Sequence, residues 1–266
     1  MIHASLDPPR SGEDNMALDQ EMLERAEREQ VTYLRLYRWS EPTLSLGHFQ
    51  QPEQRGEHAP SSRIAMVRRA SGGGAIVHDC EWTYAIAMPQ PKLLVGASQE
   101  LYDLIHDRLT ELLRSLGWPA FKWNRSCSTH SVEGTNSVPL KETAGEKKES
   151  KQPFLCFERR SCGDIVIGEH KVVGSAQRRF GSSVLQHGSI LLCRSAAAPE
   201  LSGILDLPRS LNRDSETPLS PSALEIESIL AANFSTPWLE LGEPLLCWIQ
   251  DALTKTTPTQ TCSSAR

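Results

Sequence analysis

The most informative stretch of the chain is residues 66–79, MVRRASGGGAIVHD, in which three consecutive glycines separate two short apolar runs. Glycine lets a backbone approach a ligand closely and adopts positive φ without steric cost. A surface turn between two strands is the simplest interpretation of Gly-Gly-Gly. The apolar runs at 64–67 and 75–77 favour a loop held between strands. The neighbouring Arg-Arg and His-Asp pairs then predict that residues 71–75, the glycine loop, contact a ligand.

The bulk composition excludes several classes of protein. The 266 residues suit one large domain or two small ones and can bury a substantial core. A net charge of −5 gives no support for nucleic-acid binding. No run approaches the roughly 18 apolar residues of a membrane span, and the N-terminus lacks the layout of a signal peptide. We therefore expect a cytoplasmic protein with no nucleic-acid or membrane partner.

The seven cysteines do not form a recognisable framework. Their number is odd, their spacing is irregular and there is no Cys-x-x-Cys. This pattern argues against a disulfide scaffold and against a structural zinc site, so we expect no metal. A reducing compartment fits such a chain. There, a single cysteine beside other functional residues is a candidate nucleophile.

Apolar periodicity and turn signals predict alternating strands and helices. Strands are expected at residues 33–39, 43–47, 64–68, 75–78, 82–88, 164–167, 171–173 and 189–192, and helices at 14–29, 99–116, 222–234 and 243–253. Asp14 or Asn15 is a candidate cap for the first helix, and Gly117 is a candidate C-terminal cap for the second. Gly168 suits a type II′ hairpin turn before Lys171.

The last third of the chain is predicted to be helical. Ser222 begins a capping box, with Leu224, Ile229 and Leu230 facing inward. Two stretches are poor in apolar residues, and we expect a flexible insertion at about 125–152 and a disordered tail at 254–266. A single catalytic domain would then occupy residues 1–253.

Three short units carry candidate chemistry. The glycine loop lacks both the Walker A and the dinucleotide-binding spacing, so its chemistry must come from backbone amides and from Arg68, Arg69 and His78. Lys171 begins an apolar strand, where it is either a surface residue or a charge held for an anion or oxyanion. His187 is either a satisfied polar residue at the start of a strand or a ligand contact.

Together these units resemble the lipoate–protein ligase and octanoyltransferase family. The resemblance rests on residues 68–79, on Lys171-Val-Val-Gly-Ser-Ala-Gln-Arg-Arg179 and on Gln186-His187-Gly188, with residues 15–19 and 39–50 matching the family's opening segments. It covers about residues 13–195 in order. The resemblance implies an α/β (α+β) fold with a curved mixed β-sheet flanked by helices, which the family places on one side. Biotin–protein ligases share this fold.

The resemblance also implies a tunnel for an eight-carbon acyl chain, with Lys171 contacting the acyl carbonyl or the acyl phosphate. By the same likeness, the substrate-binding residues are Arg69, Ser71, Gly72, Gly73, Gly74, Ala75, His78, Gly174, Ser175, Ala176, His187 and Gly188.

Cys156 separates the possible reactions. Leu155-Cys156-Phe157 resembles the segment that holds the nucleophile in octanoyltransferases of Gram-positive type, with Leu155 in place of the usual alanine. Cys162 is a competitor in a turn-like setting, and a small buried residue is the plain alternative for Cys156. A nearby Lys171 would stabilise both the thiolate and the oxyanion.

The expected function is transfer of octanoyl from acyl carrier protein, through a thioester on Cys156, to a lysine of a lipoyl domain or glycine-cleavage H-type protein. No cofactor is needed for that reaction. One alternative is a lipoate–protein ligase that uses ATP and Mg to form lipoyl-AMP. Another is a non-catalytic acyl-binding paralogue. The arginine pairs 159–160 and 178–179 are candidate contacts for acidic partner proteins.

Overall fold

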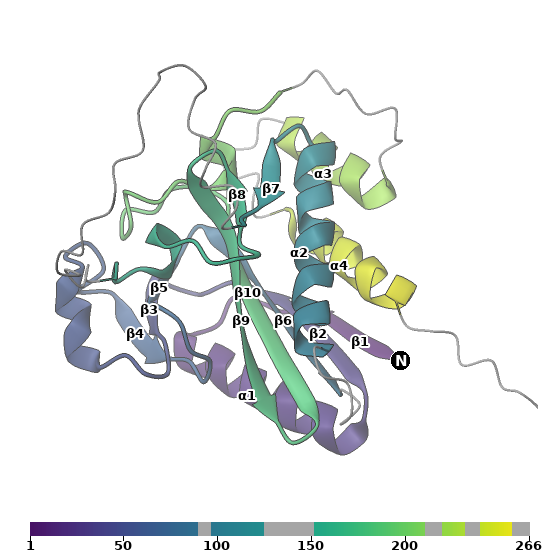
Figure 1. The fold of residues 1–266 in the computed structure, drawn as a ribbon, viewed down its shortest axis with the longest axis horizontal. Helices are drawn as coiled ribbons and strands as arrows, with labels where there is room; N and C mark the ends of the chain where they lie inside the picture. The colour runs from purple at the N-terminus through teal and green to yellow at the C-terminus, as the bar shows by residue number, and fades with distance from the viewer. Residues whose placement is uncertain (90–96, 125–151, 211–219, 232–239, 257–266) are drawn as a thin grey trace, which may run out of the picture.

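A computed structural model describes residues 1–89, 97–124, 152–210, 220–231 and 240–256, and Figure 1 shows their arrangement. Within these residues a seven-stranded mixed sheet has the order β1-β2-β6-β10-β9-β8-β7, and a three-stranded sheet has the order β4-β3-β5. The strands are β1 (Ile2–Leu6), β2 (Thr32–Tyr37), β3 (Thr43–Leu46), β4 (Ala65–Arg68), β5 (Ile76–His78), β6 (Glu81–Pro89), β7 (Ala120–Lys122), β8 (Ile165–Ile167), β9 (His170–Phe180) and β10 (Ser183–Leu191).

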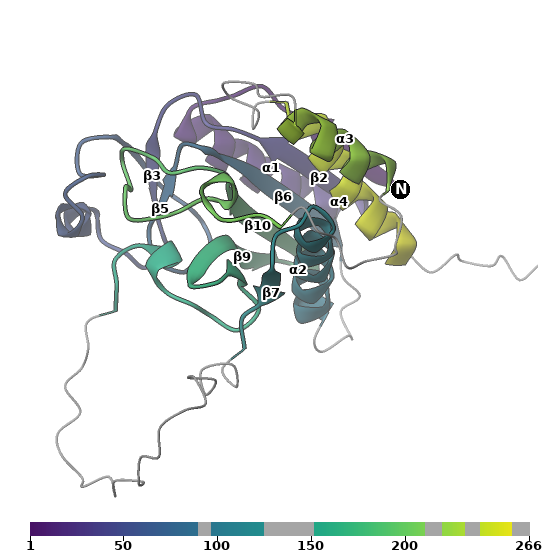
Figure 2. The same cartoon turned by 90° about the horizontal axis from the view of Figure 1, so that it is seen from above.

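Helices pack on both faces of the large sheet. The main core lies between the sheet and α2 (Ala97–Ser115), α3 (Pro221–Ala231) and α4 (Gly242–Thr256). Figure 2 shows these three helices gathered together. On the other face, α1 (Gly12–Glu29) buries Met22, Leu23 and Ala26 against residues of β2, β6 and β10. The fold is therefore the expected mixed sheet flanked by helices, but the placement on one side only is wrong.

The glycine loop connects β4 to β5 in the small sheet. β3 pairs with both strands, in parallel with β4 and antiparallel to β5, so the two ends of the loop are fixed on a common neighbour. This arrangement confirms a loop held between strands.

The long hairpin β9–β10 was only partly predicted. The sequence indicated strands at 171–173 and 189–192, whereas the two strands pair from Phe180 opposite Ser183 to Val173 opposite Ile190. The small and polar residues of this hairpin lack the apolar alternation by which half-buried strands are recognised. β1 and β7 were not predicted either: β7 has only three residues, and β1 alternates apolar and polar residues over only five.

Helix starts needed correction. The first helix begins at Gly12, and its cap is Ser11, whose Oγ accepts a hydrogen bond from the backbone N–H of Asp14 at 3.1 Å. α3 is capped by Ser220, whose Oγ accepts from the N–H of Ala223 at 3.2 Å, not by Ser222. The cap therefore lies two residues earlier than predicted. Leu224 is 54% exposed, so its predicted inward position is wrong, whereas Ile229 and Leu230 pack against the main core.

The turn glycines behave as predicted. Gly117 ends α2 with φ +93°, and Gly168 begins the β8–β9 turn with φ +58°. α4 continues to Thr256, so the expected tail begins three residues too early. Most of the predicted insertion and tail, residues 125–151 and 257–266, lies outside the described residues.

Candidate active site

Arg69 organises the glycine loop from inside. The residue is 3% exposed, and its guanidinium donates from Nη1 to the backbone oxygen and Oγ of Ser45, at 2.9 and 3.0 Å. Nη2 donates to the carbonyl oxygens of Gly72 and Gly74, at 3.1 and 2.5 Å. Burial lowers the pKa of Arg69 to about 10, which leaves it charged at neutral pH. The loop is thus shaped around a buried cation, with Gly73 at φ +99°.

The segment that contains Cys156 docks on the end of this loop. The N–H of Ala75 donates to the carbonyl oxygen of Phe154 at 3.1 Å, and the N–H of Cys156 donates to the carbonyl oxygen of Ala75 at 2.7 Å. Leu155, between them, is fully buried. This parallel bridge places Cys156 at the start of a short 3-10 helix (Cys156–Glu158) beside the glycine loop.

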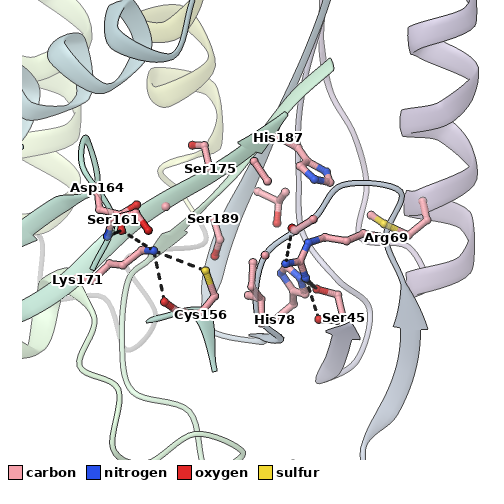
Figure 3. Close-up of a pocket in the computed structure, with 18 of the residues that line it drawn as sticks. Ser45, Arg69, His78, Cys156, Ser161, Asp164, Lys171, Ser175, His187 and Ser189 are labelled. Carbon is pink, nitrogen blue, oxygen red and sulfur yellow. Dashed lines mark hydrogen bonds and ion pairs between the residues drawn. The ribbon is translucent and has the colours of Figure 1, made fainter. Parts of the chain in front are cut away.

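Lys171 reaches Cys156 from the start of β9. Its Nζ lies 3.6 Å from Sγ and 3.4 Å from the carbonyl oxygen of Cys156 (Figure 3). The same ammonium forms an ion pair with Asp164 Oδ2 at 2.8 Å, and both side chains are 3% exposed. The contact therefore places a buried lysine directly beside the Cys156 sulfur. Cys162 is exposed and does not line this pocket.

The turn before β8 holds Asp164 in place. Oδ2 of Asp164 accepts the N–H of Ser161 at 2.6 Å, and Oδ1 accepts the hydroxyl of Tyr102 at 3.4 Å. Gly163 has φ +91°, and a Cβ there would lie 2.7 Å from the ring of Tyr102. A glycine is therefore required for Tyr102 to approach the carboxylate.

A buried hydrogen-bond chain runs behind the pocket wall, and its direction can be assigned. His106 Nδ1 lies 2.7 Å from the carbonyl oxygen of Gly163, which can only accept, so Nδ1 carries the proton. Burial lowers the pKa of His106 to about 4, so Nε2 is unprotonated at neutral pH and accepts the hydroxyl of Ser175 at 2.6 Å. Ser175 must then accept from Tyr84, at 2.5 Å, and Tyr84 accepts from Gln186.

This chain shows which way the hairpin residues face. Ser175 and its cross-strand neighbour Gly188 lie toward Tyr84 and α2, since a Cβ on Gly188 would meet both Ser175 Oγ and the Tyr84 ring. Side chains alternate along a strand, so Gly174 and His187, each one residue away, face the opposite side, where Lys171 and the glycine loop lie.

Two further buried networks surround the pocket. Ser71 Oγ is hydrogen-bonded to His187 Nε2, and His187 Nδ1 lies 3.3 Å from Asp19 Oδ2. Separately, His78 stacks on Trp39 with ring centroids 3.9 Å apart and is hydrogen-bonded to two polar side chains, Ser45 and Glu81. Both histidines therefore have partners within the protein as well as a face toward the pocket.

The structure brings most of the predicted site residues around one cavity of about 140 Å³. Those that line it are Cys156, Lys171, Arg69, Gly72, Gly73, His78, Gly174, Ser175, Ala176, His187 and Gly188. Ser71 and Ala75 support this wall through the contacts described above. Gly74 lines a neighbouring cavity of about 240 Å³ together with Gly73 and Arg159.

Several lining residues had no signal as site residues in the sequence. They are Met16, Tyr37, Ser45, Ile76, Thr83, Tyr102, Ser161, Asp164 and Ser189. Trp39 also lines the pocket; like Met16, Ser45 and Ile76, it lies in a segment that matches the family but was assigned no role. An isolated polar residue in a strand, such as Ser189, cannot be distinguished by local pattern from one that faces solvent.

The chain belongs to the lipoyl protein ligase A/B catalytic domain family, whose model matches residues 11–233. Among curated relatives, the octanoyltransferase LipM of Moorella thermoacetica is 35% identical over 200 residues, which cover 73% of this chain and 65% of that protein. The LipM of Bacillus subtilis is 32% identical over 182 residues, covering 67% of this chain and 60% of that protein. The chain thus spans less than two thirds of the length of these two relatives.

A solved structure supports the fold. The T. acidophilum protein Ta0514 with bound lipoic acid has a TM-score of 0.53 at 17% identity, with 96% of this chain and 94% of that chain covered. Among the described residues, no helix is long and apolar enough to cross a membrane. No group of three or more potential metal-ligating His, Cys, Asp or Glu side chains occurs in the same ranges.

Proposed function

We propose that this protein is an octanoyltransferase that forms a thioester on Cys156. The observation that carries the proposal is the 3.6 Å approach of Lys171 Nζ to Cys156 Sγ at the edge of a pocket walled by the glycine loop. Relatives named octanoyltransferase support the same reaction class. The pocket's mixture of small and apolar lining residues suits a straight acyl chain.

The proposed reaction has two half-reactions. The Cys156 thiolate attacks the carbonyl carbon of an octanoyl thioester, and the carbonyl π electrons move to oxygen. The oxyanion collapses, the donor thiolate leaves and takes up a proton, and octanoyl-Cys156 remains. The amine of an acceptor lysine then attacks the same carbonyl, loses a proton and releases Cys156. In both steps Lys171, held by its buried ion pair with Asp164, stabilises the thiolate and the oxyanion.

Acyl carrier protein as donor and a lipoyl-domain or H-type protein as acceptor complete the proposal. Such reactions need no ATP, metal or other cofactor. Two arginine pairs remain candidates for docking these partners. Arg160 is exposed and pairs with Glu169, while Arg178 donates to the carbonyl oxygen of Ala70 beside the glycine loop at 2.9 Å. Charge reversal of either pair should raise the KM for the carrier protein in a salt-sensitive manner.

The second candidate function is an ATP-dependent lipoate–protein ligase. The observation that favours it is the glycine loop itself: among the described residues, the backbone N–H groups of Gly72, Gly73 and Gly74 have no hydrogen-bond partner. Successive free amides are suited to bind a phosphate as well as an acyl oxygen. A non-catalytic acyl-binding protein is the third possibility, and the Cys156–Lys171 approach argues against it.

One experiment separates the three. The pure full chain is incubated with octanoyl-acyl carrier protein without ATP, and its intact mass is measured. An octanoyl adduct that is absent from Cys156→Ala supports the transferase. No adduct, together with lipoate-dependent ATP–pyrophosphate exchange, supports the ligase. Absence of both activities in a folded protein leaves binding alone.

A further inference from the structure

Ser189 has an unusual position for a buried hydroxyl. It lies on β10, is 2% exposed, and its Oγ has no hydrogen-bond partner among the described residues. A buried hydroxyl without a hydrogen-bond partner destabilises the folded state, and most buried polar groups therefore have a partner. Ser189 nevertheless lines the central pocket together with Cys156 and Lys171. Figure 3 shows its side chain directed into that pocket.

The strand register places this hydroxyl opposite the Lys171 ammonium. Ser189 pairs directly with Gly174 of β9, and directly opposed residues of antiparallel strands project to the same face, with Cβ atoms about 5 Å apart. A Cβ built on Gly174 would lie 2.9 Å from Lys171 Nζ. Lys171 therefore occupies the space that Gly174 leaves empty, and Ser189 faces it from the next strand.

Lys171 and Ser189 both line the pocket that Cys156 borders. Lys171 Nζ is 3.6 Å from Sγ but is also engaged with Asp164. Thr83, which pairs with Ser189 on its other side, cannot help, because its hydroxyl is hydrogen-bonded to Glu81 and Trp39. Ser189 is thus a pocket-facing hydroxyl in this part of β10 that is free to bind a substrate oxygen.

We infer that Ser189 is a catalytic residue that donates a hydrogen bond, opposite Lys171, to the carbonyl oxygen of the acyl group as it becomes an oxyanion. This role rests on the proposed Cys156 thioester. Ser189 keeps its proton throughout, so the bonds made and broken are those of the two half-reactions given above. The hydroxyl gains its partner only when an acyl group is present, which explains why it is buried without one.

The test compares two reactions of Cys156 in the full chain. Octanoyl-N-acetylcysteamine thioester acylates the sulfur through an oxyanion, whereas iodoacetamide alkylates it by displacement at carbon, without one. Ser189→Ala should slow acylation by about 10²-fold, the typical effect of losing one oxyanion donor, and leave the alkylation rate unchanged. Its urea midpoint should not fall, since no hydrogen bond within the protein is lost. Ser189→Thr, which keeps the hydroxyl, should recover part of the acylation rate.

Ser183 provides a matched control on the same strand. It is also 2% exposed, but its Oγ donates to Glu27 Oε2 at 2.8 Å. Ser183→Ala should therefore lower the urea midpoint and leave acylation normal.

Each outcome decides the assignment. Equal acylation by wild type and Ser189→Ala would overturn the role of Ser189 alone. If Ser189→Ala slowed alkylation as much as acylation, Ser189 would act on the reactivity of the Cys156 thiol and not on the oxyanion. Unfolding of Ser189→Ala would make it a structural residue. If wild type takes up no octanoyl group, the Cys156 thioester fails, and the role of Ser189 fails with it.

Discussion

Lys171 Nζ lies 3.6 Å from the sulfur of Cys156, at a contact that joins two elements fifteen residues apart in the chain. The lysine is held on its other side by Asp164, and both members of that ion pair are buried. Burying an ion pair is costly unless its geometry is good. This pair therefore fixes a positive charge where a thiolate and an oxyanion would form.

The first prediction concerns this ion pair. Lys171→Met should abolish measurable octanoyl transfer and cost about 3–5 kcal/mol of unfolding free energy, because it leaves Asp164 buried without its partner. The double variant Lys171→Met/Asp164→Leu should recover most of that stability without recovering activity. Urea denaturation and the intact-mass assay measure the two effects. Equal stabilities of the single and double variants would contradict the prediction.

Neighbouring arginines provide a second, paired prediction. Arg69→Lys should lower the octanoyl-transfer rate by about 10-fold or more, since an ammonium cannot reproduce the forked contacts to Ser45, Gly72 and Gly74. Arg68 is exposed, so Arg68→Lys should behave like wild type. Steady-state kinetics with both variants make the comparison, and similar losses in the two would disprove the role given to Arg69.

The third prediction follows from the pKa of His106, which burial lowers to about 4. Between pH 6.5 and pH 4 the unfolded state binds a proton at this residue that the folded state does not, so stability falls as the pH falls through this window. The contribution lost is about 3 kcal/mol. His106→Gln, which keeps one donor and one acceptor, should show a shallower decline. Urea denaturation at several pH values gives both slopes, and identical slopes would count against a neutral, buried His106.

Gly188 gives the fourth prediction. A Cβ there would lie 2.4 Å from Ser175 Oγ and 2.6 Å from the Tyr84 ring. Gly188→Ala should therefore destabilise the protein by about 1–3 kcal/mol and break the hydrogen-bond chain to His106. Gly56→Ala is the control, because a Cβ at Gly56 meets nothing within 4 Å. Thermal unfolding of both variants tests the expectation, which fails if the two are equally stable.

The local sequence pattern predicted the elements that have strong apolar periodicity or a glycine or proline at their end. The 99–116 helix is an example: its leucine spacing and Gly117 located α2 to within about two residues at each end. The sequence pattern failed to predict elements that tertiary contacts stabilise. β9 and β10 are built of small and polar residues that become strands by pairing with each other, and Ser220 caps α3 although Ser222 has the better motif.

Residue type and spacing along the chain were enough to indicate the family and the glycine loop and to single out Cys156 and Lys171 as candidate catalytic residues. The pairing of Asp164 with Lys171, the contact of Ser175 with His106 and the position of Ser189 in the pocket could be seen only in the folded chain. They depend on strand register. Side chains alternate between the two faces of a sheet, so one residue of register decides which polar groups meet in the pocket.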